Sequence, residues 1–374
     1  MAFLTDRRNF LFMTGLAALA AIAVVLGAAF SAGAQGNWEQ VLAAARKEGK
    51  VSVSGPPGDI YRIALNDAFQ KKYPDIIVEW DGSSGREKMP KIVRERKSGL
   101  FNWDLYIGGS GSPLRVLKPL NAFDPLRPEV ILPDNLEDSK WIGGFDAGFV
   151  DAEGTLIYAF DGTRQDVIYV NRDFIPASEF SAFKQLPDPK FAGKIVWEDP
   201  RREGSGLNSG LLFMLTFGED FLKELLSKQK IVYTRDRRQL TEWVVRGRYP
   251  IGISFPEDIF KPFKEKGLGK NVVPLEDESL VKSYSQGFGS VAVFNRRPHP
   301  NATKVYLNWL LSREGQTSWV TNSFGRNSRR ADAPVGDAKN ALTSNEKFFN
   351  TQSEPYIPKR RLVMKIASEL IAEK

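Results

Sequence analysis

Four short stretches of this 374-residue chain combine glycine, serine, proline and arginine in a way that suits the binding of a small polar or anionic ligand. They span residues 55–59, 83–86, 109–111 and 201–205. Glycine lets a ligand approach backbone N–H groups, serine hydroxyls donate hydrogen bonds, and arginine binds carboxylate or phosphate with two parallel hydrogen bonds. Glycine and serine also form ordinary turns, so the recurrence of the pattern, and not any single stretch, indicates a binding site.

Catalytic chemistry has few candidate residues in this sequence. With one histidine and no cysteine, a histidine-activated nucleophile would depend entirely on His299. No P-loop, complete GxGxxG or HExxH motif occurs, and residues 108–112 (GGSGS) miss the GxSxG pattern because Ser112 takes the last position. Glu198 and Asp199 are adjacent carboxylates, but neighbours on an extended chain point in opposite directions. We therefore expect no catalytic residues, no resident metal and no cofactor.

The single histidine lies in residues 296–304, RRPHPNATK. Pro298 and Pro300 bracket it, and Asn301 is placed to cap the helix that follows. We expect His299 to be a structural residue at a joint between a strand and a helix, and neither a ligand nor a catalyst.

The amino-terminal region has the pattern of an export signal. Arg7 and Arg8 precede an uncharged, mostly apolar run over residues 9–30, and Ala32 and Ala34 suit a signal peptidase. The run RRNFL favours the twin-arginine route over general secretion, although Asp6 stands where that motif prefers serine or threonine. An uncleaved anchor is the alternative, because about 20 apolar residues can span a bilayer. Without cysteine there is no acceptor for a lipid anchor, so we expect a protein of the Gram-negative periplasm.

The formal net charge of +7 is spread over a chain in which acidic and basic residues are interspersed. Such a distribution forms no basic stripe, and we expect no nucleic-acid partner. A modest positive charge raises the encounter rate of small anions, and it equally serves solubility.

The candidate stretches follow predicted strands, and this fixes where they must lie. Strand patterns lead through these loops into amphipathic helices, and the repeated β-α unit predicts mostly parallel sheets flanked by helices in an α/β fold. Ligands of such sheets bind at the carboxyl ends of the strands. The predicted strands are 51–54, 76–80, 103–107, 194–197, 249–255 and 291–294, and the predicted helices are 60–73, 89–97 with Pro90 in its first turn, 207–217 and one with Asp236 as its N-cap.

The β-α alternation restarts near residue 194, which indicates two lobes without an internal sequence repeat. The chain bridges them near 167–171 and returns near 283–294. We place the signal at 1–34, lobe 1 at 35–165 with a return segment at about 285–325, and lobe 2 at 166–284 with C-terminal helices at about 326–374. The candidate ligand-binding residues are Pro57, Gly58, Asp59, Ser83, Ser84, Arg86, Gly109, Ser110, Arg201, Arg202, Ser205, Tyr284 and Ser285.

Together these segments resemble the periplasmic solute-binding proteins of ABC importers, in particular the ferric-iron type. The resemblance covers most of the chain after the signal and is specific to the family, not to a ligand. The stretches that carry it are 38–58 (WEQVLAAARKEGKVSVSGPPG), 95–105 (ERKSGLFNWDL), 193–206 (GKIVWEDPRREGSG), 237–254 (RRQLTEWVVRGRYPIGIS) and 298–316 (PHPNATKVYLNWLLSREGQ).

The resemblance implies a type 2 periplasmic binding fold, in which two lobes close on a solute in the cleft between them. It further implies delivery of the solute to a membrane permease powered by a separate ATPase, by a chain that catalyses nothing. We also expect this chain to be a monomer. A secreted hydrolase and a periplasmic sensor module are the less favoured alternatives.

One departure concerns the ligand. Iron binders of the family typically use two neighbouring tyrosines just past a strand of the second lobe, where this chain has residues 254–258, SFPED, and no adjacent tyrosines occur anywhere in it. Ferric iron is a hard cation that prefers phenolate and carboxylate oxygens. We expect a small anionic or polar solute, with ferric ion, alone or with an anion, as the alternative.

Overall fold

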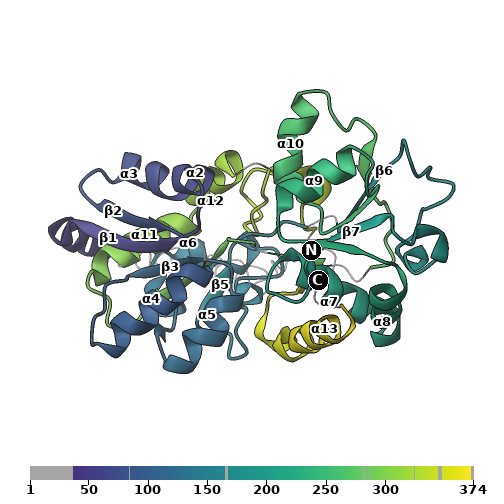
Figure 1. Cartoon of the computed structure of the whole chain (residues 1–374). Helices are drawn as coiled ribbons and strands as arrows, with labels where there is room; N and C mark the ends of the chain where they lie inside the picture. Colours follow the sequence, from purple (N-terminus) through teal and green to yellow (C-terminus); the bar gives the residue numbers. More distant parts are fainter. Residues whose placement is uncertain are drawn as a thin grey trace, which may run out of the picture.

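The computed structural model describes residues 37–83, 85–164, 167–280, 283–285, 287–323, 325–343 and 348–371, apart from the side chains of Arg86 and Asp258. The predicted export signal and Ser84 lie outside these residues. Two α/β lobes stand side by side, one around β1–β5 and β12 and the other around β6–β10 (Figure 1).

The first lobe begins with a helix over residues 37–48, which ends at Gly49, where φ is +70°. Its sheet contains β1 (Lys50–Gly55), β2 (Ile77–Gly82), β3 (Leu105–Gly108), β4 (Phe123–Asp124), β5 (Ile157–Ala159) and the returning β12 (Ser290–Phe294). Its helices are α2 (Asp59–Arg62) continued by a π-helical turn (Ile63–Asp67) and α3 (Ala68–Lys72), then α4 (Gly85–Lys97), α5 (Gly111–Val116), α6 (Pro133–Leu136), α11 (Pro300–Leu311) and α12 (Arg313–Asn322).

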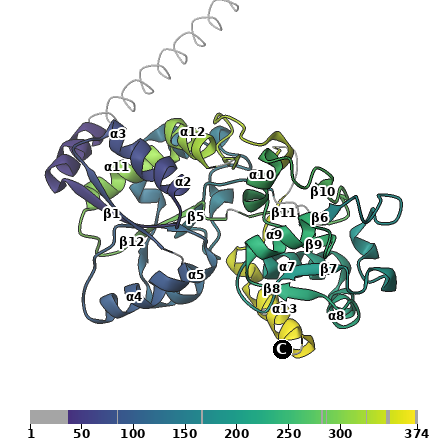
Figure 2. The same cartoon turned by 45° about the horizontal axis from the view of Figure 1, so that its top comes forward.

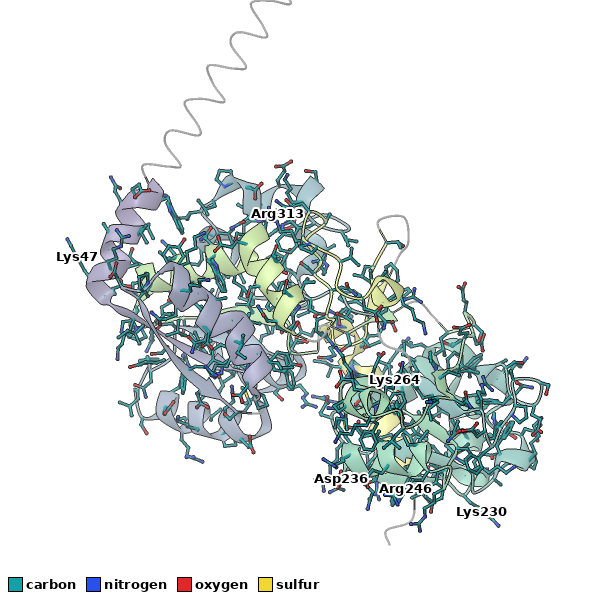
Figure 3. All side chains as sticks on the ribbon, turned by 90° about the horizontal axis from the view of Figure 1, so that it is seen from above. Lys47, Lys230, Asp236, Arg246, Lys264 and Arg313 are labelled. Carbon is teal, nitrogen blue, oxygen red and sulfur yellow. The ribbon has the colours of Figure 1, made fainter. Side chains whose placement is uncertain are left out.

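The second lobe has a sheet of β6 (Ile168–Asn171), β7 (Ile195–Glu198), β8 (Val232–Thr234), β9 (Ile251–Ile253) and β10 (Val272–Pro274). Its helices are α7 (Ser205–Phe217), α8 (Glu219–Lys228), α9 (Arg237–Val245), α10 (Glu257–Glu265) and the C-terminal α13 (Ile357–Leu370), which packs against α7 and α8. Figure 3 shows the two lobes as separate masses of side chains, with Lys47 and Arg313 on the first and Lys230, Asp236, Arg246 and Lys264 on the second.

The two sheets share one strand order. The first runs β2-β1-β3-β12-β4, and the second, taken in the same sense, runs β8-β7-β9-β6-β10. Each sheet contains one strand that follows a crossing of the chain between the lobes, β12 in the first and β6 in the second. This strand lies antiparallel to its neighbours in the sheet. The topology therefore repeats although the sequence does not.

Helices cover both faces of each sheet (Figure 1). In β12, Val291 and Val293 pack into the core shared with α11, whereas Ala292 and Phe294 pack into the core beneath α4. Side chains of a strand alternate between faces, so a strand that is apolar on both faces must lie inside three layers.

Three connecting segments join the lobes and hydrogen-bond to one another. The backbone N–H groups of Phe160 and Asp161 both donate to the carbonyl of Gly289, at 3.0 and 3.1 Å, and the Asn327 N–H donates to the Thr163 hydroxyl at 2.8 Å. Short strands β11 (Ser283–Tyr284) and β13 (Phe349–Asn350) pair in parallel, and Figure 2 shows β11 on the side of the second lobe that faces the first. These paired segments connect the two lobes, and we refer to them as the hinge.

The alternation of strands and helices is confirmed, while three local predictions are wrong. Helix α4 begins at Gly85, so Pro90 lies inside the helix and not in its first turn. Strand β9 ends at Ile253, because Ser254 adopts a positive φ of 60°. Asn301 does not cap α11, because His299 is the N-cap residue and Pro300 the first helical residue.

Candidate functional site

The clearest contact between the lobes is a carboxylate held by two arginines. Glu203 lies in the loop between β7 and α7, and its Oε1 accepts a hydrogen bond from Arg115 of α5. Its Oε2 accepts from Nη2 of Arg360, in α13, at 2.5 Å. The contact thus joins the first lobe, the second lobe and the C-terminal helix. A small cavity beside it is lined by Gly111, Arg115, Glu203, Gln352, Ile357, Arg360 and Arg361.

The loop that carries Glu203 is packed tightly against the end of its strand. A Cβ atom on Gly206 would lie 2.0 Å from the carbonyl oxygen of Glu198, so only glycine fits there. The Ser205 hydroxyl donates to Glu198 at 2.5 Å, and Gly204 adopts a φ of +152°. This local structure projects Glu203 towards the first lobe.

Arg201 and Arg202, from the same loop, have different surroundings. Arg201 donates through Nε and Nη2 to Asp199 at 2.9 and 3.0 Å, and Arg235 donates to the same carboxylate at 3.2 Å. Burial opposes ionisation of Asp199, but the hydrogen bonds from Arg201 outweigh it and lower the pKa of Asp199. Arg202 is exposed. Arg201 therefore has a carboxylate partner within its own loop.

Gly109, Ser110 and Ser285 come together around Gln352. The Ser110 hydroxyl donates to the Gln352 carbonyl at 2.9 Å, and the Gln352 amide donates to the Ser285 hydroxyl at 2.7 Å. A Cβ on Gly109 would lie 3.2 Å from the carbonyl oxygen of Gly287 and 3.6 Å from Oε1 of Gln352, so this backbone approach is close. The neighbouring Tyr284 is buried.

The remaining predicted residues lie at the ends of β1 and β2. Ser83 donates to Asp81 at 2.8 Å, and Asp59 is exposed and lies 3.6 Å from Arg62. Pro57 and Gly58 lie in the turn between β1 and α2. For Arg86 the structure describes only a place in the first turn of α4.

A buried lysine ties these two strand ends together. The Lys88 ammonium donates to the carbonyl of Gly55, at the end of β1, and at 3.1 Å to that of Asp81, near the end of β2. Only 2% of Lys88 is exposed, and burial lowers its pKa to about 8.

Sequence reasoning missed Arg115, Glu203, Gln352 and Arg360 as site residues. Glu203 belongs to a loop that the sequence had singled out, but its role depends on arginines 88 and 157 residues away in the chain. Residues 359–361 form a basic run in the sequence. Nothing in the local sequence indicates that Arg360 is buried while Arg361 is exposed.

The place where iron-binding relatives are expected to carry tyrosines has a different structure. Ser254 is buried, and its hydroxyl lies 2.7 Å from that of Ser209, while Phe255 stacks on Tyr169 with ring centres 4.6 Å apart. Over the part of the chain that the structure describes, no group of three or more His, Asp or Glu side chains is placed to hold a metal ion. The same residues contain no helix both long and apolar enough to cross a membrane.

Comparisons with known proteins give the same architecture. A sequence profile of the family described as bacterial extracellular solute-binding protein matches residues 50–324. A protein of Haemophilus influenzae is 23% identical over 280 residues, which cover 74% of this chain and 77% of that protein. Iron-bound HitA from Pseudomonas aeruginosa superposes with a TM-score of 0.63 at 16% identity, covering 86% of this chain and 99% of HitA.

A second similar structure is the periplasmic binding protein AfuA from Actinobacillus pleuropneumoniae with exogenous fructose-6-phosphate bound. Its TM-score is 0.60 at 20% identity, and the match covers 86% of this chain and 98% of AfuA. These likenesses confirm the predicted two-lobe α/β fold.

Proposed function

Because this chain belongs to the family of bacterial extracellular solute-binding proteins, we propose that it captures a small anionic solute between its lobes for an ABC importer. The observation that carries the proposal is the lining of the cavity at the lobe junction. The charged residues of this lining are three arginines, Arg115, Arg360 and Arg361, and one carboxylate, Glu203, so the net charge of the lining is positive. Guanidinium groups match the geometry of carboxylate and phosphate oxygens.

Ferric ion is the second candidate, because HitA, a similar structure, is described as iron-bound. AfuA, with fructose-6-phosphate, illustrates the anionic alternative on the same fold. A positively charged lining repels a cation, and the sequence has no adjacent tyrosines to supply phenolates. Both observations favour the anion.

The ligand contacts belong to the proposal as well. Gly109, Ser110 and Ser285 lie beside Gln352, which also lines the cavity, and this neighbourhood supports them as part of the site. We assign Pro57, Gly58, Asp59, Ser83 and Tyr284 to the first-lobe wall and the hinge, and Arg201, Arg202 and Ser205 to the second-lobe wall. Ser84 and the side chain of Arg86 lie outside the described residues, and both stay predicted ligand contacts.

The site acts by binding, without chemical turnover. Closure of the lobes is a shift in population, driven by contacts that exist only when both lobes hold the solute. The protein works as a periplasmic monomer after removal of a signal peptide, and it delivers the solute to a permease with a separate ATPase. A hydrolase would instead convert a substrate, and a sensor module would bind a protein partner.

A ligand screen on protein purified from the periplasm tests the proposal. Thermal unfolding is followed with ferric citrate, ferric chloride, inorganic phosphate, sugar phosphates and dicarboxylates, and hits are titrated calorimetrically. A ligand at 100 times its Kd stabilises the folded state by about 2.7 kcal/mol, which shifts the melting temperature by several degrees. Stabilisation by ferric salts, with no response to any anion, would refute the anion assignment.

Arg86 gives a residue-level test on the first-lobe wall. Replacing it with alanine should weaken the anion by more than about 1 kcal/mol if the contact is charged and shielded from water. Arg94→Ala is the matched control, because Arg94 is exposed on the same helix. Equal affinities in the two variants would remove Arg86 from the site.

A further inference from the structure

Glu203 makes the contacts that a bound anion would make. One carboxylate oxygen faces Arg115 and the other faces Arg360, so a single carboxylate uses an arginine from each side of the junction. Ligand carboxylates and phosphates are bound by paired arginines in the same manner. Arg115 and Arg360 thus form an anion-binding site, and the carboxylate that occupies it is the side chain of Glu203.

The two arginines are fixed to different degrees. The Arg360 side chain is only 6% exposed, and its Nη1 donates to Asn208 and, at 3.3 Å, to the carbonyl of Thr351. Arg115 is 26% exposed. Arg360 is therefore held in place on the second lobe by its own hydrogen bonds. Arg115 is more exposed and reaches Glu203 from the first lobe.

Among the described residues, the cavity beside Glu203 is too small for a solute while Glu203 is in place. The cavity beside it holds about 10 Å³, roughly the space that one water needs. A Cβ on Gly111 would lie 3.5 Å from Oε2 of Glu203, so the carboxylate also fills the space against the first lobe. Gly204, directly after Glu203, has a φ of +152°, a backbone conformation that glycine adopts more readily than other residues.

We infer that Glu203 is a built-in competitor that occupies the Arg115–Arg360 pair until the carboxylate or phosphate group of a solute displaces it. The inference rests on the proposed function and names the part of the site that holds the charged group of the solute. An intramolecular group on a short loop competes at an effective concentration in the millimolar range or above. Glu203 therefore weakens the apparent affinity for anions and, through Arg115, ties the lobes together in the absence of solute.

The test compares full-length variants in calorimetric titrations with inorganic phosphate and with succinate, which separate the two oxyanion sources. Glu203→Gln keeps the size of the side chain and removes its charge, and we expect it to bind at least one of the two probes about tenfold more tightly than the parent protein. Glu203→Asp shortens the side chain by one methylene, and its affinity for the probe should lie between those of the parent protein and Glu203→Gln. Adding Arg115→Gln to Glu203→Gln should abolish the gain.

Glu354→Gln is the matched control. Glu354 is 24% exposed, close to the 28% of Glu203, and pairs with Lys118 outside the arginine pair. It should leave the affinity for both probes unchanged. Far-ultraviolet circular dichroism and the melting temperature establish that each variant is folded.

The outcomes separate the inference from the proposed function. If the parent protein binds an anion and Glu203→Gln binds it equally well or more weakly, Glu203 does not compete with the anion. Glu203 then either contacts the ligand or only links the two lobes, and only the inference fails. If neither protein binds either probe, the inference fails for these oxyanions. If the ligand screen also finds no anion, the proposed function fails with it.

Discussion

His299 Nδ1 lies 2.8 Å from Oδ2 of Asp104, and the backbone N–H of the same histidine donates to Oδ1, also at 2.8 Å. The Ser52 N–H donates to Oδ2 at 2.7 Å, so one buried carboxylate joins β1, β3 and the start of α11. Burial raises the pKa of Asp104, and the hydrogen bonds from Ser52 and His299 oppose that rise. The single histidine of the chain thus holds the connection between β12 and α11 in place inside the first lobe.

Replacing His299 with alanine should lower the free energy of unfolding by about 1–3 kcal/mol, because Asp104 loses one of its donors in a buried place. Urea unfolding measures this loss. Anion affinity, measured by calorimetry under conditions where the variant is folded, should not change. Unchanged stability together with weaker binding would instead make His299 a ligand residue.

Lys88 should make stability depend on pH in the alkaline range. Its folded pKa of about 8 lies below the value of about 10.4 expected in the unfolded chain. Between these two values the unfolded state binds more protons, so the contribution of this lysine to the free energy of unfolding rises with pH. Relative to Lys88→Met, the parent protein should gain on the order of 2 kcal/mol between pH 7.5 and 10.

Urea unfolding of both proteins at several pH values tests this. Lys97→Met is the control, since Lys97 lies exposed at the end of the same helix, and its loss should leave the slope of the parent protein intact. A Lys88→Met profile parallel to that of the parent protein would contradict the assignment.

The sequence indicates the local elements well because hydrophobic periodicity and helix ends are local. The Asp236 cap of α9 is one example, since its carboxylate accepts from the Gln239 N–H at 3.0 Å as the capping pattern predicts. Where a distant residue competes, local reasoning fails. Glu48 accepts from the backbone and side chain of Asn301 and from the Ala302 N–H, so a carboxylate from another helix caps α11 in place of Asn301.

The site is harder to predict than the fold for the same reason. Arg201 donates two hydrogen bonds to Asp199, which lies only two positions earlier in the chain, so this ion pair could have been predicted from the sequence. The hydrogen bonds from Arg115 and Arg360 to Glu203 depend on where α5 and α13 lie relative to the loop between β7 and α7. Periodicity carries no information about either.

Export gives a prediction that depends on the sequence alone. If the twin-arginine route is used, replacing both Arg7 and Arg8 with lysine should abolish the periplasmic pool, as seen by immunoblotting of cell fractions. Mass spectrometry of the exported parent protein should find Gln35 as its first residue. Arg46→Lys, in the helix over residues 37–48, is the control and should be exported normally. Continued export of the double variant would indicate general secretion.

The buried ion pair in the hinge should be worth far more than an exposed one. Arg326 donates to both oxygens of Asp161 at 2.7 Å, and Asp161 is fully buried and also accepts from Trp319 at 2.8 Å. Asp161→Asn removes the buried negative charge that Arg326 binds and should lower the free energy of unfolding by about 3–5 kcal/mol.

The control for the hinge pair is Asp67→Asn, which breaks an ion pair with Arg62 whose side chains are 44% and 43% exposed. Its loss should change stability by less than about 1 kcal/mol. Because Asp161 and Arg326 act as a pair, the double variant Asp161→Asn/Arg326→Gln should lose less stability than the sum of the two single variants in urea unfolding. A loss for Asp161→Asn no larger than that for Asp67→Asn would mean that backbone pairing alone holds the hinge.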